Sequence, residues 1–190
     1  MRRSLVPCRT SEPVWRRVGG ACPTAVPAAA WSWIIEPGSL TRRVQEGCAG
    51  VFELRLLRQG WGDALPSERR LLRADHRHGR DLIREVELLC DGAPRVFART
   101  VIPARSLIGR AHELTRLGTR PLGAVLFADP STRRGAVEFA RLSPAHGLFA
   151  AATAHSTGER PAELWGRRTV YRFADKPLLV NEIFLPVLMR

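Results

Sequence analysis

The stretch LIREVELLCDGAPRVFARTVIP, residues 82–103, decides the fold. Two runs of β-prone residues flank Asp91-Gly92, and an Asp-Gly pair in that setting predicts a tight turn, because glycine accepts a positive φ. We therefore predict an antiparallel hairpin. The runs 164–173 and 177–186 are likewise separated by a short turn segment and predict a second hairpin.

An arginine shares the apolar face of the first strand. Strand side chains repeat every second residue, so Arg84 lies on the same face as Val86. If a two-residue turn sets the register, Arg84 falls opposite Arg99, and two facing guanidiniums are unfavourable unless an anion lies beside them. A planar guanidinium favours a carboxylate as that anion. The hairpin alone leaves open that both arginines reach solvent or pair with Glu85 and Glu87.

A glutamate repeats this anomaly in the last strand. Glu182 shares a face with Val180 and Phe184. A carboxylate on an apolar strand face is expected to be paired, protonated or catalytic. An ion pair with Arg84 or Arg99 in the core is the structural alternative.

Two predicted helix starts offer backbone amides. Ser39 is a candidate N-cap for a short helix over 40–45, and Pro121 suits the first position of another. The first amides of a helix have no intrahelical partners and attract anions, so Leu40 and Leu122 each present a free N–H. An ordinary capped surface helix would explain either segment alone. Together with the arginines, they indicate a carboxylate ligand.

The remaining pattern completes an α+β domain. We expect residues 1–27 to form an irregular N-terminal extension and residues 28–190 to form one domain. Predicted elements are helices over 28–35 and 106–117, strands over 51–57 and 132–142, a helical turn over 68–73 with Ser67 as a possible cap, and one short helix within 143–163. Residues 125–128 either finish the helix that begins at Pro121 or begin a strand.

Composition limits the function classes. The formal charge is +12, and Lys176 is the only lysine. The arginines are scattered in pairs without interleaved aromatics, which disfavours a nucleic-acid partner. No apolar run approaches the roughly 20 residues that span a bilayer. Four separated cysteines without a C-x-x-C pair favour reduced thiols and a cytoplasmic location. His76 and His78 have no evident third ligand, so we expect no metal.

Several ordered motifs resemble one family. They are Trp33 with Ser39-Leu40-Thr41, LIREV at 82–86, Asp91-Gly92, RTVIP at 99–103, Leu117-Gly118, RPLG at 120–123, LWGRR at 164–168, and KPLL at 176–179 continuing through Glu182 to FLP at 184–186. This set is similar to the chorismate pyruvate-lyase family. The resemblance implies a single antiparallel β-sheet with surrounding helices and an internal ligand site closed by flaps. The N-terminal extension and the longer 143–163 segment depart from the family pattern.

The resemblance also implies roles for residues. The ligand arginine falls on Arg84, the catalytic glutamate on Glu182, the carboxylate-binding amides on Leu40 and Leu122, and a second site arginine on Arg99. It implies elimination of pyruvate from chorismate to give 4-hydroxybenzoate for ubiquinone synthesis, without cofactor or metal, in a cytoplasmic monomer. The competing interpretation is a non-catalytic effector-binding domain of the same fold that holds a small anion.

Overall fold

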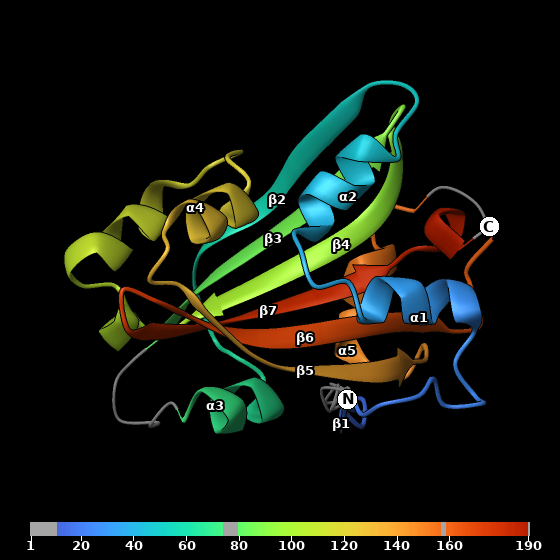
Figure 1. Cartoon of the computed structure of the whole chain (residues 1–190), viewed down its shortest axis with the longest axis horizontal. Coiled ribbons are helices and arrows are strands. Elements are labelled where there is room, and N and C mark those ends of the chain that lie inside the picture. Colours follow the sequence, from blue (N-terminus) through green and yellow to red (C-terminus); the bar gives the residue numbers. More distant parts are fainter. Residues whose placement is uncertain (1–10, 74–79, 157–158, 190) are drawn as a thin grey trace, which may run out of the picture.

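The computed structural model describes residues 11–73, 80–156 and 159–189. Within these residues, seven strands form one antiparallel sheet in the order β1-β5-β6-β7-β4-β3-β2, which confirms the predicted α+β class (Figure 1). The strands are β1 (Arg16–Arg17), β2 (Phe52–Gly62), β3 (Asp81–Cys90), β4 (Ala93–Ile102), β5 (Arg133–Leu142), β6 (Leu164–Phe173) and β7 (Lys176–Phe184). The predicted strand 132–142 and both predicted hairpins are present.

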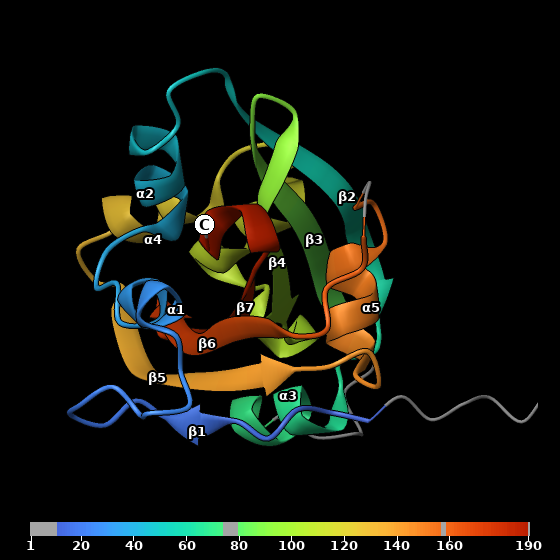
Figure 2. The same ribbon diagram turned by 90° about the vertical axis from the view of Figure 1, so that its right-hand side faces the viewer.

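Helices cover both faces of the sheet. They are α1 (Ala28–Ile34), α2 (Leu40–Glu46), α3 (Pro66–Leu72), α4 (Leu122–Ala128) and α5 (Gly147–Thr153), with 3₁₀ segments η2 (Ala104–Ser106), η3 (Gly109–Arg116) and η4 (Pro186–Met189). In Figure 2, α1, α2 and α4 lie on one side of the sheet, here called the front face, and α5 lies on the other, the back face. Helix α3 also packs on the back face, where Leu72 joins Ile83, Val101 and Leu179 in one apolar cluster.

The β3–β4 hairpin corrects the predicted register. Asp91 and Gly92 form the turn with φ of 50° and 72°. A bulge then follows, because Leu88 pairs with Val96 whereas Leu89 pairs with Pro94. One extra residue on β4 shifts every later partner and reverses the face that each presents.

The shift separates the two arginines. Arg84 pairs with Thr100, and Arg99 pairs with Glu85. The predicted Arg84–Arg99 pair is therefore wrong. Arg84 points to the front face and Arg99 to the back face.

Other elements differ in extent from the sequence prediction. Strand β2 continues through Gly60 to Gly62, because it pairs along the full length of β3. The predicted helix over 106–117 is instead covered by η2 and η3, which Leu107 and Ile108 separate. Gly109, the first residue of η3, has a φ of 55°, which a right-handed α-helix does not include. Leu65, not Ser67, is the N-cap of α3. Residues 125–128 finish α4. His76 and His78 lie outside the described residues.

The segment expected to be irregular contributes a short strand. Arg16 and Arg17 pair with Phe139 and Glu138 of β5. No helix among the described residues is long and apolar enough to cross a membrane.

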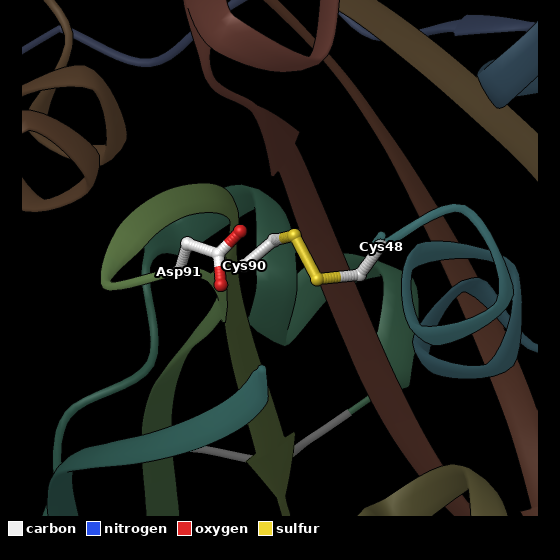
Figure 3. Close-up of side chains that lie close together, drawn as sticks. All are labelled: Cys48, Cys90 and Asp91. Atoms are coloured by element: carbon white, nitrogen blue, oxygen red, sulfur yellow. A yellow bond between two sulfur atoms is a disulfide. The ribbon is translucent and has the colours of Figure 1, made fainter. Parts of the chain in front are cut away.

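A disulfide joins the end of α2 to the central hairpin, contrary to the expected reduced thiols. Cys48, two residues beyond α2, is bonded to Cys90 at the end of β3, with Cα atoms 5.6 Å apart (Figure 3). Spacing along the chain did not reveal the pair, because 42 residues separate the two cysteines. Beside it, Asp91 accepts a hydrogen bond of 2.8 Å from the amide of Val51. The cross-link holds the C-terminal end of α2 against the sheet.

We expect Cys48→Ser to lower the free energy of unfolding, because the open chain regains conformational entropy. The chain-entropy relation gives about 4 kcal/mol as an upper value for a separation of 42 residues. Urea unfolding without reductant measures the loss, and reductant should abolish the difference from wild type. Cys22→Ser is the matched control, since Cys22 is exposed and free. Equal midpoints for Cys48→Ser and wild type without reductant would contradict a cross-linked native state.

Candidate active site

A cavity lies on the front face beneath α2 and α4. Strands β3, β4, β7 and β6 form its floor, and the first residues of the two helices form its rim. Apolar side chains supply most of the wall. Its polar side chains include Arg84, Thr100, Arg167, Tyr171 and Glu182. An apolar cavity with a few convergent polar groups is typical of a small-molecule site.

Arg84 is a buried cation with no acidic partner among the described residues. Its Nε and Nη2 donate hydrogen bonds to backbone carbonyls. Nη2 donates to the carbonyl of Gly118 at 2.9 Å and to that of Arg120 at 2.9 Å. Burial lowers the pKa of Arg84 to about 10, so the guanidinium stays charged at neutral pH. A desolvated charge without a counter-ion favours an anionic ligand, because an anion removes the cost of burying it.

The rim consists of two helix N-termini. Ser39 caps α2 by accepting a hydrogen bond from Arg42 at 3.4 Å, as predicted. Leu40 and Leu122 are the first residues of α2 and α4, and both are buried. Helix geometry leaves their N–H groups without intrahelical acceptors. The two amides and Arg84 therefore border one cavity, as the sequence predicted.

Glu182 pairs with an arginine that the sequence analysis overlooked. Its Oε2 accepts a hydrogen bond of 2.7 Å from Nε of Arg167, its direct neighbour on β6. The alternative of a core ion pair between Glu182 and Arg84 or Arg99 is wrong. The LWGRR motif did contain the signal, because alternation along a strand over 164–173 places Arg167 on one face and Arg168 on the other.

The cation Arg84 and the acid Glu182 both line the cavity, on strands β3 and β7 with β4 between them. Arg84 pairs with Thr100 of β4, which pairs in turn with Val180 of β7. Glu182 lies two residues beyond Val180 on the same face and pairs with Ala98 of β4. Two strand spacings and two residues of rise put their Cα atoms roughly 12 Å apart. A ligand with a carboxylate at one end and a hydroxyl at the other suits this arrangement.

Tyr171 lines the wall between α4 and β6. Burial, followed by the charge of Glu182, raises the pKa of Tyr171, so its hydroxyl stays protonated at neutral pH. Phe127 of α4 packs edge-on against the Tyr171 ring with centroids 6.4 Å apart. This contact fixes α4 to the sheet. No sequence pattern indicates this contact, because the two residues are far apart in the chain.

Arg99 takes no part in the cavity. On the back face it donates to Glu85 at 2.6 Å and to Glu68 of α3 at 3.0 Å. Burial alone would lower the pKa of Arg99, but the two carboxylates outweigh it and raise the pKa. Asn181 also donates to Glu68, at 2.9 Å. Arg99 thus anchors α3 to the sheet, and its predicted place in the ligand site is wrong.

The comparisons agree with this description. An antiparallel sheet with helices on both faces and a cavity beneath two helix N-termini define the class: an α+β domain with a cavity lined by Arg84, Arg167 and Glu182. A family model described as chorismate lyase matches residues 13–190. The chain belongs to the chorismate lyase family.

Two relatives illustrate the sequence match. A protein of Methylococcus capsulatus is 43% identical over 159 residues, covering 83% of this chain and 95% of that protein. A protein of Thiobacillus denitrificans is 38% identical over 185 residues, covering 95% and 97%. Both are named probable chorismate pyruvate-lyase.

Solved structures share the fold at low identity. The effector domain of PhnF from Mycobacterium smegmatis has a TM-score of 0.58 at 16% identity, covering 80% of this chain and 91% of that one. The C-terminal domain of the histidine utilization repressor from Pseudomonas syringae has a TM-score of 0.52 at 10% identity, covering 74% and 95%. These likenesses show the fold alone.

We expect Gly123→Ala to weaken ligand binding with little loss of stability. A Cβ at this position of α4 would lie 2.8 Å from Oγ of Ser39, so either the Ser39 hydroxyl leaves its capping position or the two helix N-termini move apart. Alanine itself favours a helix by roughly 1 kcal/mol. Titration with 4-hydroxybenzoate should show a several-fold higher Kd, and the double variant Gly123→Ala/Ser39→Ala should recover part of it. Unchanged affinity would show that the close approach of Gly123 to Ser39 does not determine the position of the two helix N-termini.

We expect Arg99→Ala to act on stability. Removing one partner of a buried ion pair leaves Glu68 uncompensated, which costs about 3–5 kcal/mol. Thermal or urea unfolding measures this loss. Arg141→Ala is the control, since its exposed pair with Glu163 should contribute less than about 1 kcal/mol. If Arg99→Ala is as stable as the wild type but no longer binds the ligand, Arg99 would belong to the ligand site after all.

Proposed function

We propose that this chain eliminates pyruvate from chorismate and releases 4-hydroxybenzoate, with the front-face cavity as the active site. The observation that carries the proposal is the buried Arg84, which has no acidic partner among the described residues and lines the front-face cavity of a chorismate lyase family member. The relatives are named for this activity. No cofactor or metal takes part in the proposed reaction.

The proposed binding mode uses the charges at the two ends of the cavity. Chorismate carries a ring carboxylate and a second carboxylate on its enolpyruvyl ether. Arg84 and the amides of Leu40 and Leu122 hold the ring carboxylate, since they combine a fixed cation with two helix N-termini. Glu182, at the far end, then faces the 4-hydroxyl of the ring.

The chemistry requires orientation and electrostatic stabilisation. The hydrogen on ring carbon 4 leaves as a proton, and the bond from carbon 3 to the ether oxygen breaks with its electron pair on oxygen. The enolpyruvyl group departs as the enolate of pyruvate, which takes up one proton to give pyruvate. The ring becomes aromatic, which drives the reaction. Glu182 contacts the 4-hydroxyl and assists proton transfer, and the neighbouring cation at this end is Arg167. Preorganised charges of this kind supply much of the rate enhancement in enzymes.

A second candidate is an effector-binding domain that holds a small anion without converting it. The favouring observation is the fold match to the effector domain of PhnF. This candidate predicts saturable binding of a carboxylate and no turnover. Supply of 4-hydroxybenzoate for ubiquinone synthesis, a monomeric state and a cytoplasmic location stay predictions from the sequence resemblance.

A steady-state assay with chorismate, following 4-hydroxybenzoate, tests the proposal. Arg84→Ala and Glu182→Ala should each lower kcat/KM by roughly 10²-fold or more, because both contacts stabilise charge in the transition state. Arg141→Ala, on the surface, should match wild type. Binding of 4-hydroxybenzoate without turnover by the wild type would favour the effector domain instead.

A further inference from the structure

Arg167 is a buried charged residue whose contacts reach beyond Glu182. It is 1% exposed, and no fully buried side chain among the described residues is larger. An arginine is rarely buried unless its donors are satisfied. The partners of Arg167 therefore indicate what the residue holds in place.

One side of the guanidinium fixes the acid. Nε donates to Oε2 of Glu182 at 2.7 Å, and the two residues face each other across the β6–β7 ladder. Charge-assisted hydrogen bonds of this length are among the stronger side-chain contacts. The carboxylate therefore has one preferred position at its end of the cavity.

The other side of the guanidinium fixes the chain that leads into α2. Nη1 donates to the carbonyls of Trp33 at 3.3 Å, Ile34 at 3.4 Å and Glu36 at 2.6 Å. The last carbonyls of a helix lack intrahelical donors and accept cationic side chains well. Arg134 of β5 adds a hydrogen bond of 3.0 Å to the Glu36 carbonyl. The link between α1 and α2 is thus bound to the sheet immediately before Ser39 and Leu40.

We propose that Arg167 is a positioning residue that couples Glu182 to the N-terminus of α2. Both ends of the substrate are then held correctly only when one guanidinium makes both sets of contacts. The inference rests on the proposed function and adds to it a residue that acts through others. Loss of Arg167 displaces the acid and loosens the helix that supplies the Leu40 amide.

The chain offers a matched control in the next residue. Arg168 is 6% exposed and donates to Glu138 at 2.7 Å, but it points to the back face. A merely structural role for Arg167 predicts that both variants lose stability and keep their kcat per folded molecule. A positioning role predicts different kinetics for the two.

The kinetic test is a double-variant cycle in the chorismate assay. Arg167→Ala should lower kcat roughly 10²-fold, and Arg167→Ala/Glu182→Ala should be no slower than Glu182→Ala within about threefold, because the two residues act as a unit. Arg168→Ala should change kcat less than about threefold, alone or with Glu182→Ala. Wild-type kcat in folded Arg167→Ala, or multiplicative losses in the cycle, would overturn the proposal.

Amide hydrogen exchange gives a readout that does not depend on turnover. The amides of 42–46, which have hydrogen-bond acceptors in α2, should exchange at least tenfold faster in Arg167→Ala and at the wild-type rate in Arg168→Ala. Arg167→Lys keeps the charge beside Glu182 but cannot also serve the carbonyls, so it should show the faster exchange even if the alanine variant fails to fold. Unchanged exchange in Arg167→Lys would refute the coupling. A wild-type protein that does not convert chorismate would refute the proposed function, and the exchange comparison would still decide the role of Arg167.

Discussion

The cavity depends on how two buried guanidiniums satisfy their donors. Arg84 donates to carbonyls in the loop before α4, and Arg167 donates to carbonyls in the link before α2. A buried donor without an acceptor costs free energy, so these hydrogen bonds hold both loops on the sheet. The helix that starts after each loop then presents its first amides to the cavity. The same hydrogen bonds therefore place the two guanidinium charges in the cavity and the helix N-termini at its rim.

The two faces of the sheet differ in whether their buried arginines have acidic partners. A continuous row of polar residues crosses the back face and consists of Glu85, Arg99, Asn181, Arg168 and Glu138. Both arginines in this row have acidic partners. Within the front-face cavity, Arg167 pairs with Glu182, whereas Arg84 has no acidic partner among the described residues. A compensated row stabilises a helix against the sheet. An uncompensated cation leaves binding capacity for a ligand.

The sequence predicted those features that depend on neighbouring residues. The Asp91-Gly92 turn, the Ser39 cap and the amides of Leu40 and Leu122 follow from local backbone chemistry, and the structure places them as expected. The position of Arg99 was wrong because a β-bulge has no clear local signal and one residue reverses the face. The contact between Cys48 and Cys90 joins segments 42 residues apart, so only the folded chain reveals it. The contact between Arg167 and Glu182 lies within the predicted second hairpin, but its register is known only from the folded chain.

The anchors of the rim indicate where a ligand enters. Helix α2 is held at its N-terminal side by Arg167 and beyond its C-terminal end by the disulfide to Cys90. Helix α4 is held by the packing of Phe127 on Tyr171. Between the helices, the close approach of Gly123 to Ser39 involves no covalent bond and no ion pair. Separation of the two N-termini at this point would break neither an ion pair nor the disulfide, so we expect a ligand to enter and leave between them.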